Sequence, residues 1–196
     1  MKNTLSEPGL DQLFRDAHTA HGFEPEPIAD ELLQKLYELL KWGPTSFNCQ
    51  PARFVFVRSA AAKERLRRVL SPANVGQTMA AAVTVIVAYD TRFFEHLPAQ
   101  FPAYDAKPIY ENNPALAQET ALRNGSLQGA YLMIAARALG LDCGPMSGFD
   151  AAALNAEFFP DGRYRSNFLV NLGTADPAKI HARGPRLAFS AVAQVL

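Results

Sequence analysis

Residues 82–89, Ala-Val-Thr-Val-Ile-Val-Ala-Tyr, constrain the fold of this chain more than any other segment. The run is apolar and rich in β-branched residues, which is the pattern of a central strand buried on both faces. Such a strand needs packed layers on both sides of its sheet. The longest apolar run, residues 80–89, is far below the roughly 18 residues that span a bilayer, so we expect no membrane segment.

Helices are predicted on both sides of this strand. Apolar spacing predicts an amphipathic helix over residues 10–20 and a second one that Asp30 caps and Gly43-Pro44 ends. A long and largely buried helix is expected over residues 115–139. The other expected elements are helices over 60–70, 73–80 and 150–158, the last capped by Asp150, and strands over 53–57, 141–146 and 165–172. This order of elements indicates an α+β or α/β sandwich.

The composition excludes several classes of protein. A length of 196 residues with 48% hydrophobic residues fits one domain with a real core and excludes intrinsic disorder. Nineteen basic and nineteen acidic side chains cancel, so we expect no nucleic-acid partner. Two cysteines, Cys49 and Cys143, cannot build a disulfide framework, and residues 1–9 lack the apolar core of a secretory signal. We therefore expect a cytoplasmic protein with free thiols.

Two segments break the regular pattern. Residues 92–114 alternate four prolines with phenylalanines and tyrosines, and a connection of this length is usually functional or disordered. The aromatic residues argue against disorder, which leaves a lid over a site or a cover over an apolar patch. The C-terminal residues 187–196 are apolar enough that they must pack on another surface.

The sequence contains no familiar metal, phosphate-loop or hydrolase motif. His18 and His21 lie three residues apart without a third ligand near them, so we expect no metal site. Cys49 has no histidine close to it in the sequence, which makes a nucleophilic role improbable. Demanding chemistry in this chain would most naturally come from a bound organic cofactor.

Two loops have the composition of ligand-binding loops. Residues 43–48, Gly-Pro-Thr-Ser-Phe-Asn, offer hydroxyl, amide and backbone N–H groups to a polar ring edge. Residues 140–148 carry a glycine every fourth residue just before a helix start, where backbone donors are free. Each loop is also compatible with an ordinary turn that has no ligand.

The same two loops resemble the signatures of a known family. Residues 42–54, Trp-Gly-Pro-Thr-Ser-Phe-Asn-Cys-Gln-Pro-Ala-Arg-Phe, resemble the Ala-Pro-Ser-Ser-x-Asn-x-Gln-Pro-Trp-x-Phe signature of the FMN-dependent nitroreductase family. Residues 138–150 resemble its second signature, which runs from a helix end into the loop at the flavin edge. The resemblance extends over essentially the whole chain and is closest to the branch of malonic semialdehyde reductases and NADH dehydrogenase/NAD(P)H nitroreductases.

This resemblance implies an α+β fold, a three-layer sandwich whose mostly antiparallel central sheet is flanked by helices. It implies one domain over residues 1–196 and a homodimer with one FMN in each of two interfacial pockets. Residues 92–114 would form a lid-like insertion, and residues 174–196 a tail that packs on the partner subunit.

The resemblance also implies a binding site for the FMN phosphate and ribityl chain. His18, Thr19 and His21 match a family element in which arginines stand at the two histidine positions. The histidines therefore weaken the phosphate anchor unless His18 is protonated or Arg15 takes its place. A basic element near the C-terminus matches His181 and Arg183, and Arg183 is the main candidate for the phosphate because guanidinium binds it bidentately. The remaining implied contacts are Thr45, Ser46 and Asn48 across the dimer, Asn74 near the pyrimidine ring, and Pro145, Met146, Ser147 and Gly148 at the reactive edge.

The implied activity is that of an FMN-dependent NAD(P)H oxidoreductase. Hydride would pass from NADH or NADPH through flavin N5 to a small acceptor by a ping-pong route, with no catalytic side chain required. Malonic semialdehyde, reduced to 3-hydroxypropionate, nitroaromatics and quinones are the candidate acceptors. The alternatives are a non-catalytic flavin-binding or flavin-sequestering protein and a structural dimer.

Overall fold

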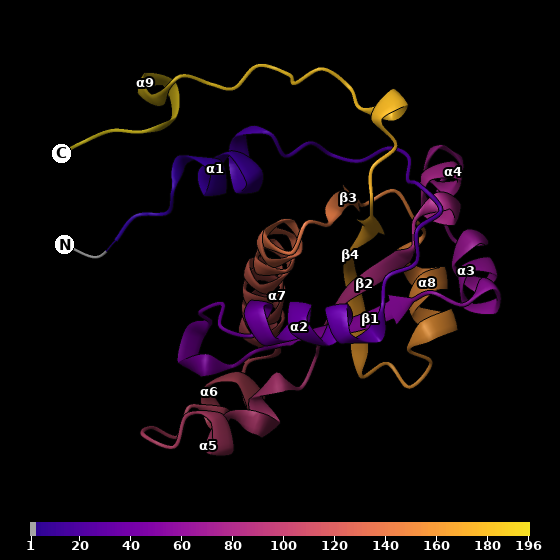
Figure 1. The fold of residues 1–196 in the computed structure, drawn as a ribbon. Coiled ribbons are helices and arrows are strands. Elements are labelled where there is room, and N and C mark those ends of the chain that lie inside the picture. The colour runs from indigo at the N-terminus through magenta and orange to yellow at the C-terminus, as the bar shows by residue number, and fades with distance from the viewer. Residues whose placement is uncertain (1–2) are drawn as a thin grey trace.

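The computed structural model describes residues 3–196 and is built around one four-stranded sheet (Figure 1). The strand order is β1-β2-β4-β3, and each neighbouring pair is antiparallel. The strands are β1 (Ala52–Val57), β2 (Val83–Asp90), β3 (Asp142–Met146) and β4 (Tyr164–Gly173). All four strand predictions are confirmed to within two residues at either end.

Strand β2 is buried along its whole length, as its apolar sequence predicted. Val83, Val85 and Val87 belong to the apolar core on one side of the sheet. Ile86 and Ala88 belong to the core on the other side. The alternation of side chains along a strand therefore supplies both cores from one segment.

Helices cover both faces of the sheet and make the three layers (Figure 1). The first core is closed by α2 (Asp30–Leu40) and the long α7 (Pro114–Ala138). The second core is closed by α3 (Ala60–Arg67), α4 (Pro72–Ala80) and α8 (Ala151–Phe158). Close packing of α7 needs Gly129, since a Cβ there would lie 2.3 Å from Cζ of Phe168. The predicted α+β sandwich is confirmed.

The N-terminal helix is shorter than predicted. It comprises α1 (Glu7–Leu10) and a π-helical turn, η1 (Asp11–Arg15), and the chain is extended from residue 17 onward. Thr19 forms a parallel bridge with Cys143, and Ala20 N–H donates to the Cys143 carbonyl at 3.0 Å. Pairing with β3 therefore overrides the helical periodicity of residues 16–20.

Two other boundaries differ slightly from the prediction. Asp30 is the first residue of α2, and Ala29 occupies the N-cap position without a side-chain bond. Helix α3 ends at Arg67 instead of residue 70, because Leu70 forms a bridge with Phe149. Asp150 caps α8 as predicted, with its side chain accepting from Ala153 N–H at 2.9 Å.

Residues 92–114 are folded into three short helical turns over an apolar cluster. These are η3 (Phe93–His96), α5 (Leu97–Gln100) and α6 (Lys107–Glu111). Phe93, Leu97 and Tyr110 are buried there against Cys49. The segment is thus a cover over an apolar patch, and its exposed Tyr104 stacks on Phe47 with ring centroids 5.9 Å apart.

A buried carboxylate anchors the start of this segment. The Asp90 side chain, 1% exposed, accepts from Arg163 Nε at 2.5 Å and from Arg53 Nη2 at 2.9 Å. Arg92 N–H also donates to it at 2.9 Å, and Arg163 bonds Glu95 at 2.6 Å. Burial acts to raise the pKa of Asp90, but the bonds from Arg163 and Arg92 N–H and the Arg53 charge together lower it below its ordinary value.

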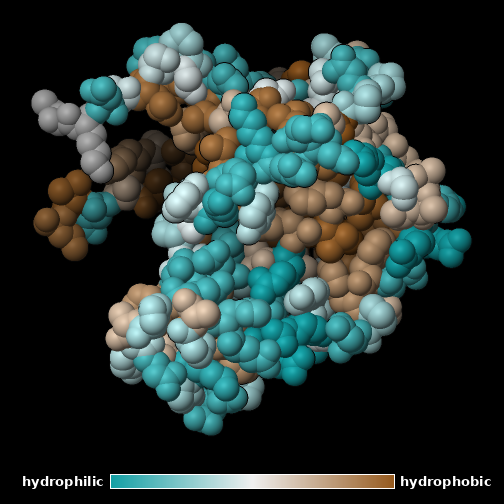
Figure 2. Space-filling model, turned by 60° about the horizontal axis from the view of Figure 1, so that its bottom comes forward, coloured by the Kyte–Doolittle hydropathy of each residue, from teal (hydrophilic) through white to brown (hydrophobic). Residues whose placement is uncertain are grey.

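The C-terminal tail leaves the body of the molecule after η4 (Pro177–Lys179) and ends beyond α9 (Phe189–Val192). Residues 177–196 are exposed throughout. Figure 2 shows apolar surface gathered on the protruding segment at the left, the side on which Figure 1 places the C-terminus. Within residues 3–196 no helix is both long enough and apolar enough to cross a bilayer.

Candidate functional site

Two adjoining clefts lie where the N-terminal segment, β3, α4 and the tail meet. The first, called the basic cleft here, has a volume of about 400 Å³. Its polar lining residues are His18, Thr19, His21, Arg137, His181, Arg183 and Arg186. None of the described residues that line it carries a carboxylate. The basic cleft therefore presents three guanidinium and three imidazole groups, which is the chemistry of an anion-binding site.

The pairing of residues 19 and 20 with β3 builds one wall of the basic cleft. Ala20 is buried, and its carbonyl oxygen lies so close to Gly144 that an added Cβ there would be 2.6 Å away. Only glycine permits this approach of the two backbones. His18 and His21 are carried on either side of the buried Ala20 and reach the cleft.

The tail builds the opposite wall. Arg183 Nη2 donates to the carbonyl oxygens of Arg15 at 2.5 Å and of Ala17 at 2.8 Å, which ties the tail to the N-terminal segment. The ring of His181 meets that of His21 edge to face, with centroids 4.8 Å apart. Arg183 thus holds the cleft together as well as contributing charge to it.

Arg15 does not replace the expected arginines. Its guanidinium is paired with Asp11 and Glu7, and it is absent from the lining of the basic cleft. Those two carboxylates raise the pKa of Arg15 and fix its side chain on the outer surface. Any positive charge in addition to the cleft arginines must come from the histidines.

The second cleft, called the amide cleft here, has a volume of about 620 Å³. His21 lines both clefts, so they adjoin at that residue. Its other lining residues are Gly22, Ala73, Asn74, Gly76, Gln77, Ala80, Pro145, Met146 and Lys179. The side-chain amides of Asn74 and Gln77, two glycines and the ammonium group of Lys179 line this cleft. This lining suits a planar ligand with hydrogen-bonding edges.

Asn74 is held in place by its neighbours on the amide cleft. Its Nδ2 donates to the Gly148 carbonyl at 2.9 Å, and Gln77 Nε2 donates to its Oδ1 at 2.8 Å. Ser71 N–H donates to the same Gly148 carbonyl at 3.0 Å. A Cβ on Gly148 would lie 2.4 Å from Asn74 Nδ2, so the glycine is needed for this arrangement.

A buried polar chain connects the amide cleft with the centre of the sheet. Thr84 Oγ1 donates to Asn171 Oδ1 at 2.7 Å, and Asn171 Nδ2 donates to Thr78 Oγ1 at 3.4 Å. Thr78 Oγ1 in turn contacts the sulfur of Met146 at 3.6 Å. Thr78, Thr84 and Asn171 are fully buried, so this chain fixes α4 and Met146 relative to β2 and β4.

Three predicted residues lie away from the two clefts. Thr45, Ser46 and Asn48 line neither of them. Instead Thr45 Oγ1 accepts from Gln50 N–H at 3.1 Å, and Asn48 Nδ2 donates to the Gln100 carbonyl at 3.1 Å. Ser46 N–H donates to the buried Asn124 side chain at 2.9 Å.

The loop that carries these residues is strained. Phe47, Asn48 and Gln50 have φ angles of 50°, 51° and 38°, in the left-handed region that disfavours residues other than glycine. Such strain persists only where surrounding structure holds it, and it is common at ligand sites. Contacts with residues 92–114 and α7 hold it here.

Of the reactive-edge residues, Pro145 and Met146 line the amide cleft, and Gly148 adjoins it through Asn74. Ser147 is exposed and does not line either cleft.

Sequence reasoning did not identify four of the polar and charged residues that line the clefts. They are Gln77, Arg137, Lys179 and Arg186. Gln77 was detectable, because it lies three residues after Asn74 on the same helix face. The other three reach the clefts from the end of α7 and from the irregular tail, and no periodicity identifies such positions.

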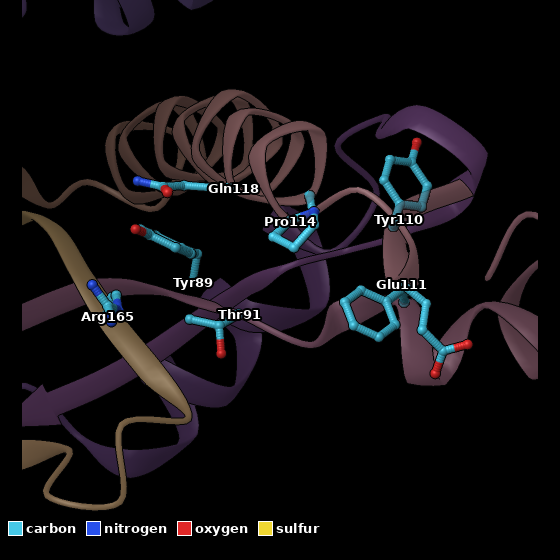
Figure 3. A pocket seen from close by; sticks show the side chains of 9 residues that line it. Tyr89, Thr91, Tyr110, Glu111, Pro114, Gln118 and Arg165 are labelled. Carbon is cyan, nitrogen blue, oxygen red and sulfur yellow. The ribbon is translucent and has the colours of Figure 1, made fainter. Parts of the chain in front are cut away.

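The cavity in Figure 3 lies at a different place, between the end of β2, β4, α6 and the start of α7. It has a volume of about 280 Å³ and is lined by none of the predicted site residues. The figure shows Tyr89, Gln118 and Arg165 at one end and Tyr110 and Glu111 at the other.

Neither cysteine is suited to nucleophilic chemistry. Burial raises the pKa of Cys49 to about 11 and that of Cys143 to about 12, so both thiols remain protonated near neutral pH. Across residues 3–196, no group of three or more His, Cys, Asp or Glu side chains is arranged to hold a metal ion.

Known proteins resemble this chain over most or all of its length. A family model described as "Nitroreductase family" matches residues 15–174. A Rhodopseudomonas palustris protein named "Putative NADH dehydrogenase/NAD(P)H nitroreductase" is 55% identical over 196 residues, the full length of both chains. A Ralstonia nicotianae protein with the same description is 55% identical over 193 residues, 98% of this chain and 99% of that one.

Solved structures share the fold at lower identity. A Bacillus subtilis protein described as a nitroreductase has a TM-score of 0.88 at 23% identity, over 97% of this chain and 100% of that one. A nitroreductase-type protein from Exiguobacterium sibiricum, solved in complex with FMN, has a TM-score of 0.86 at 21% identity over all of both chains. These likenesses confirm the predicted three-layer fold.

Proposed function

Because the chain belongs to the nitroreductase family, we propose that it is an FMN-dependent oxidoreductase with NAD(P)H as its electron donor. The full-length relatives carry NAD(P)H nitroreductase in their names, and the Exiguobacterium structure contains FMN. The observation that carries the proposal is the pair of adjoining clefts, one basic and with no carboxylate among its described lining residues, and one lined by amides.

The basic cleft fits the phosphate of FMN. A phosphate dianion is best held by charge-assisted donors, and guanidinium groups provide them in pairs. Arg183, His18, His181 and the Thr19 hydroxyl would hold the phosphate and the neighbouring ribityl oxygens. His21, which lines both clefts, would lie beside the ribityl chain that joins the FMN phosphate to the flavin ring.

The amide cleft fits the ring. The edge of the pyrimidine part of a flavin alternates carbonyl oxygens with ring nitrogens, which an amide side chain can bind with both its donor and its acceptor. Asn74 would do so, oriented by Gln77 and Gly148. Pro145 and Met146, which line this cleft, would border the reactive edge together with Ser147 and Gly148, which follow them in the chain.

When bound, FMN supplies the hydride-transfer chemistry between NAD(P)H and the acceptor. The chain's own residues bind and orient the three molecules and limit the access of water. The hydride transfer itself requires no nucleophilic side chain, and both thiols are protonated near neutral pH. Donor and acceptor would occupy one place in turn, so ping-pong kinetics are expected.

We further propose that the active form is a homodimer in which residues 45–48 of one chain meet the clefts of its partner. The strained loop and the protruding apolar tail support this arrangement. Exposed apolar side chains on and beside α2 and α7 give a surface that a second copy would cover. They are Tyr37, Leu39, Trp42, Leu122, Leu127 and Tyr131, and the tail adds Leu187, Phe189, Val192 and Val195.

The acceptor is proposed to be a small molecule: malonic semialdehyde, reduced to 3-hydroxypropionate, a nitroaromatic or a quinone. Residues 92–114 would serve as the lid-like wall of the acceptor site. Their exposed Tyr104, stacked on Phe47 beside the 45–48 loop, offers a flat aromatic surface to a planar acceptor.

The test begins with the purified protein, which should be yellow and should release FMN on denaturation. Addition of NADH or NADPH without oxygen should bleach the flavin absorbance, and each acceptor should restore it at its own rate. Protein that cannot be reconstituted with FMN would contradict the proposal.

A non-catalytic flavin-binding or flavin-sequestering protein is the second candidate function. It shares the two clefts but predicts that NAD(P)H leaves the flavin absorbance unchanged. Anaerobic stopped-flow with both nicotinamides therefore separates the two functions.

A further inference from the structure

The basic cleft differs from an anion site made of arginines alone, because half of its basic groups are histidines. His18, His21 and His181 line it together, and the last two are in ring contact with centroids 4.8 Å apart. Imidazole changes its charge near neutral pH, whereas guanidinium does not. The number of positive charges in this cleft can therefore change with its occupancy.

The groups around the histidines concentrate positive charge in the cleft. Arg137, Arg183 and Arg186 line it together with the three imidazoles. An anion that enters favours the protonated form of each imidazole, since a positive ring then gains an opposite charge.

The carboxylates nearest to the cleft do not line it. Asp16 and Asp142 belong to the neighbouring cavity, which shares Ala17 and Arg137 with the cleft, and Asp142 accepts from Ala175 N–H at 2.8 Å. On the surrounding elements Arg15 pairs with Glu7 and Asp11, and Lys179 pairs with Asp176 at 3.2 Å. Since no described carboxylate lines the cleft, an anionic ligand would bring the counter-charge for protonated histidines into it.

We propose that a phosphomonoester binds in the basic cleft together with a proton that is taken up by the group His18, His21 and His181. The inference rests on the proposed function, in which the phosphomonoester is FMN. It predicts that the affinity of the basic cleft for the phosphomonoester falls as pH rises. A site lined by arginines alone would keep its charge over the same pH range. The ring contact holds His21 and His181 side by side in the cleft.

The sign and the size of the effect follow from linkage. A phosphate monoester loses its second proton near pH 6, so at about pH 7.5 the ligand is already a dianion and any proton taken up goes to the protein. Linkage of one proton makes the dissociation constant rise by up to about tenfold for each pH unit over which binding takes up that proton. Between about pH 6.5 and 8.0 we expect a five- to tenfold rise for FMN.

The test measures protons directly. The apoprotein is titrated with FMN by calorimetry at about pH 7.5 in two buffers of different ionisation enthalpy. The observed binding enthalpy differs between the two buffers in proportion to the number of protons taken up. Riboflavin, which has the same ring and ribityl chain without the phosphate, is the matched ligand. We expect an uptake of about one proton with FMN and close to none with riboflavin.

Variants assign the proton to the histidines. His18→Gln and His181→Gln are each expected to lower the proton uptake and to flatten the pH dependence of FMN binding. Arg186→Gln removes a charge from the same cleft without a titrating group, so it should weaken binding and leave the uptake unchanged. Because His181 and Arg186 are exposed tail residues, these changes do not disturb the core.

The outcomes separate the inference from the proposed function. Binding of FMN without proton uptake, or with the same uptake as riboflavin, overturns the inference and leaves the function in place. Uptake that persists undiminished in both histidine variants overturns it as well. Failure of FMN to bind at any pH overturns the proposed function and the inference together.

Discussion

The buried carboxylate of Asp90 allows the strongest stability prediction, that for Asp90→Asn. The substitution keeps the size of the side chain but leaves Arg53 without its counter-charge and Arg163 with Glu95 alone. Removal of one partner from a buried ion pair costs about 3–5 kcal/mol, and the partial exposure of the two arginines, 15% and 26%, lowers this to about 2–4 kcal/mol. For a chain of this length, that loss lowers the melting temperature by about 5–15 °C.

The prediction has a definite dependence on pH. The pKa of Asp90 is lower in the folded chain than its ordinary value near 3.9, so the carboxylate stabilises the fold fully above that ordinary value. The contribution is lost as pH falls toward the lowered folded pKa. Urea unfolding of wild type and Asp90→Asn should therefore differ most at about pH 7 and converge below about pH 4.

A matched substitution distinguishes this account from a general effect of removing a carboxylate. Glu64→Gln also removes a carboxylate paired with arginine, but on the exposed face of α3, and should leave the unfolding free energy unchanged. A loss for Asp90→Asn no larger than that of Glu64→Gln, or a loss that grows as pH falls, would refute the reasoning.

Three further predictions concern packing, cofactor and assembly. Gly129→Ala should destabilise the chain by about 1–3 kcal/mol in urea unfolding because its Cβ meets Phe168, whereas Gly76→Ala, which has open space, should not. Arg183→Ala should weaken FMN retention by about 1.5–3 kcal/mol in fluorescence titrations, and equal retention would remove Arg183 from the site. Deletion of residues 187–196 should shift the sedimentation equilibrium toward monomer, and an unchanged dimer would show that the tail packs elsewhere.

The sheet could be predicted from the sequence because its central strand is recognisable from its own residues alone. Residues 83–90 are buried on both faces, so the apolar run identifies the strand without knowledge of its neighbours. The long helix α7 was equally clear from its lack of charge between residues 124 and 136. By contrast, residues 16–20 have helical periodicity but pair with β3, and a contact so distant in sequence leaves no local signal.

The site was predictable only in part for a related reason. The resemblance to family elements identified His18, Asn74 and Met146, which the structure brings to the clefts. Arg137 and Arg186 reach the basic cleft from a helix end and an irregular tail, where sequence spacing carries no geometric information. The contact proposed for residues 45–48 is with a second chain, and such a contact leaves no periodic signal within one sequence.

The most direct test of the account is a crystal structure of the protein with FMN. The account predicts a dimer with the phosphate beside Arg183 and His18, the ring against Asn74 and Met146, and residues 45–48 of the other chain against the same ring. FMN bound in the cavity of Figure 3, or a monomer that binds FMN with both clefts vacant, would contradict it.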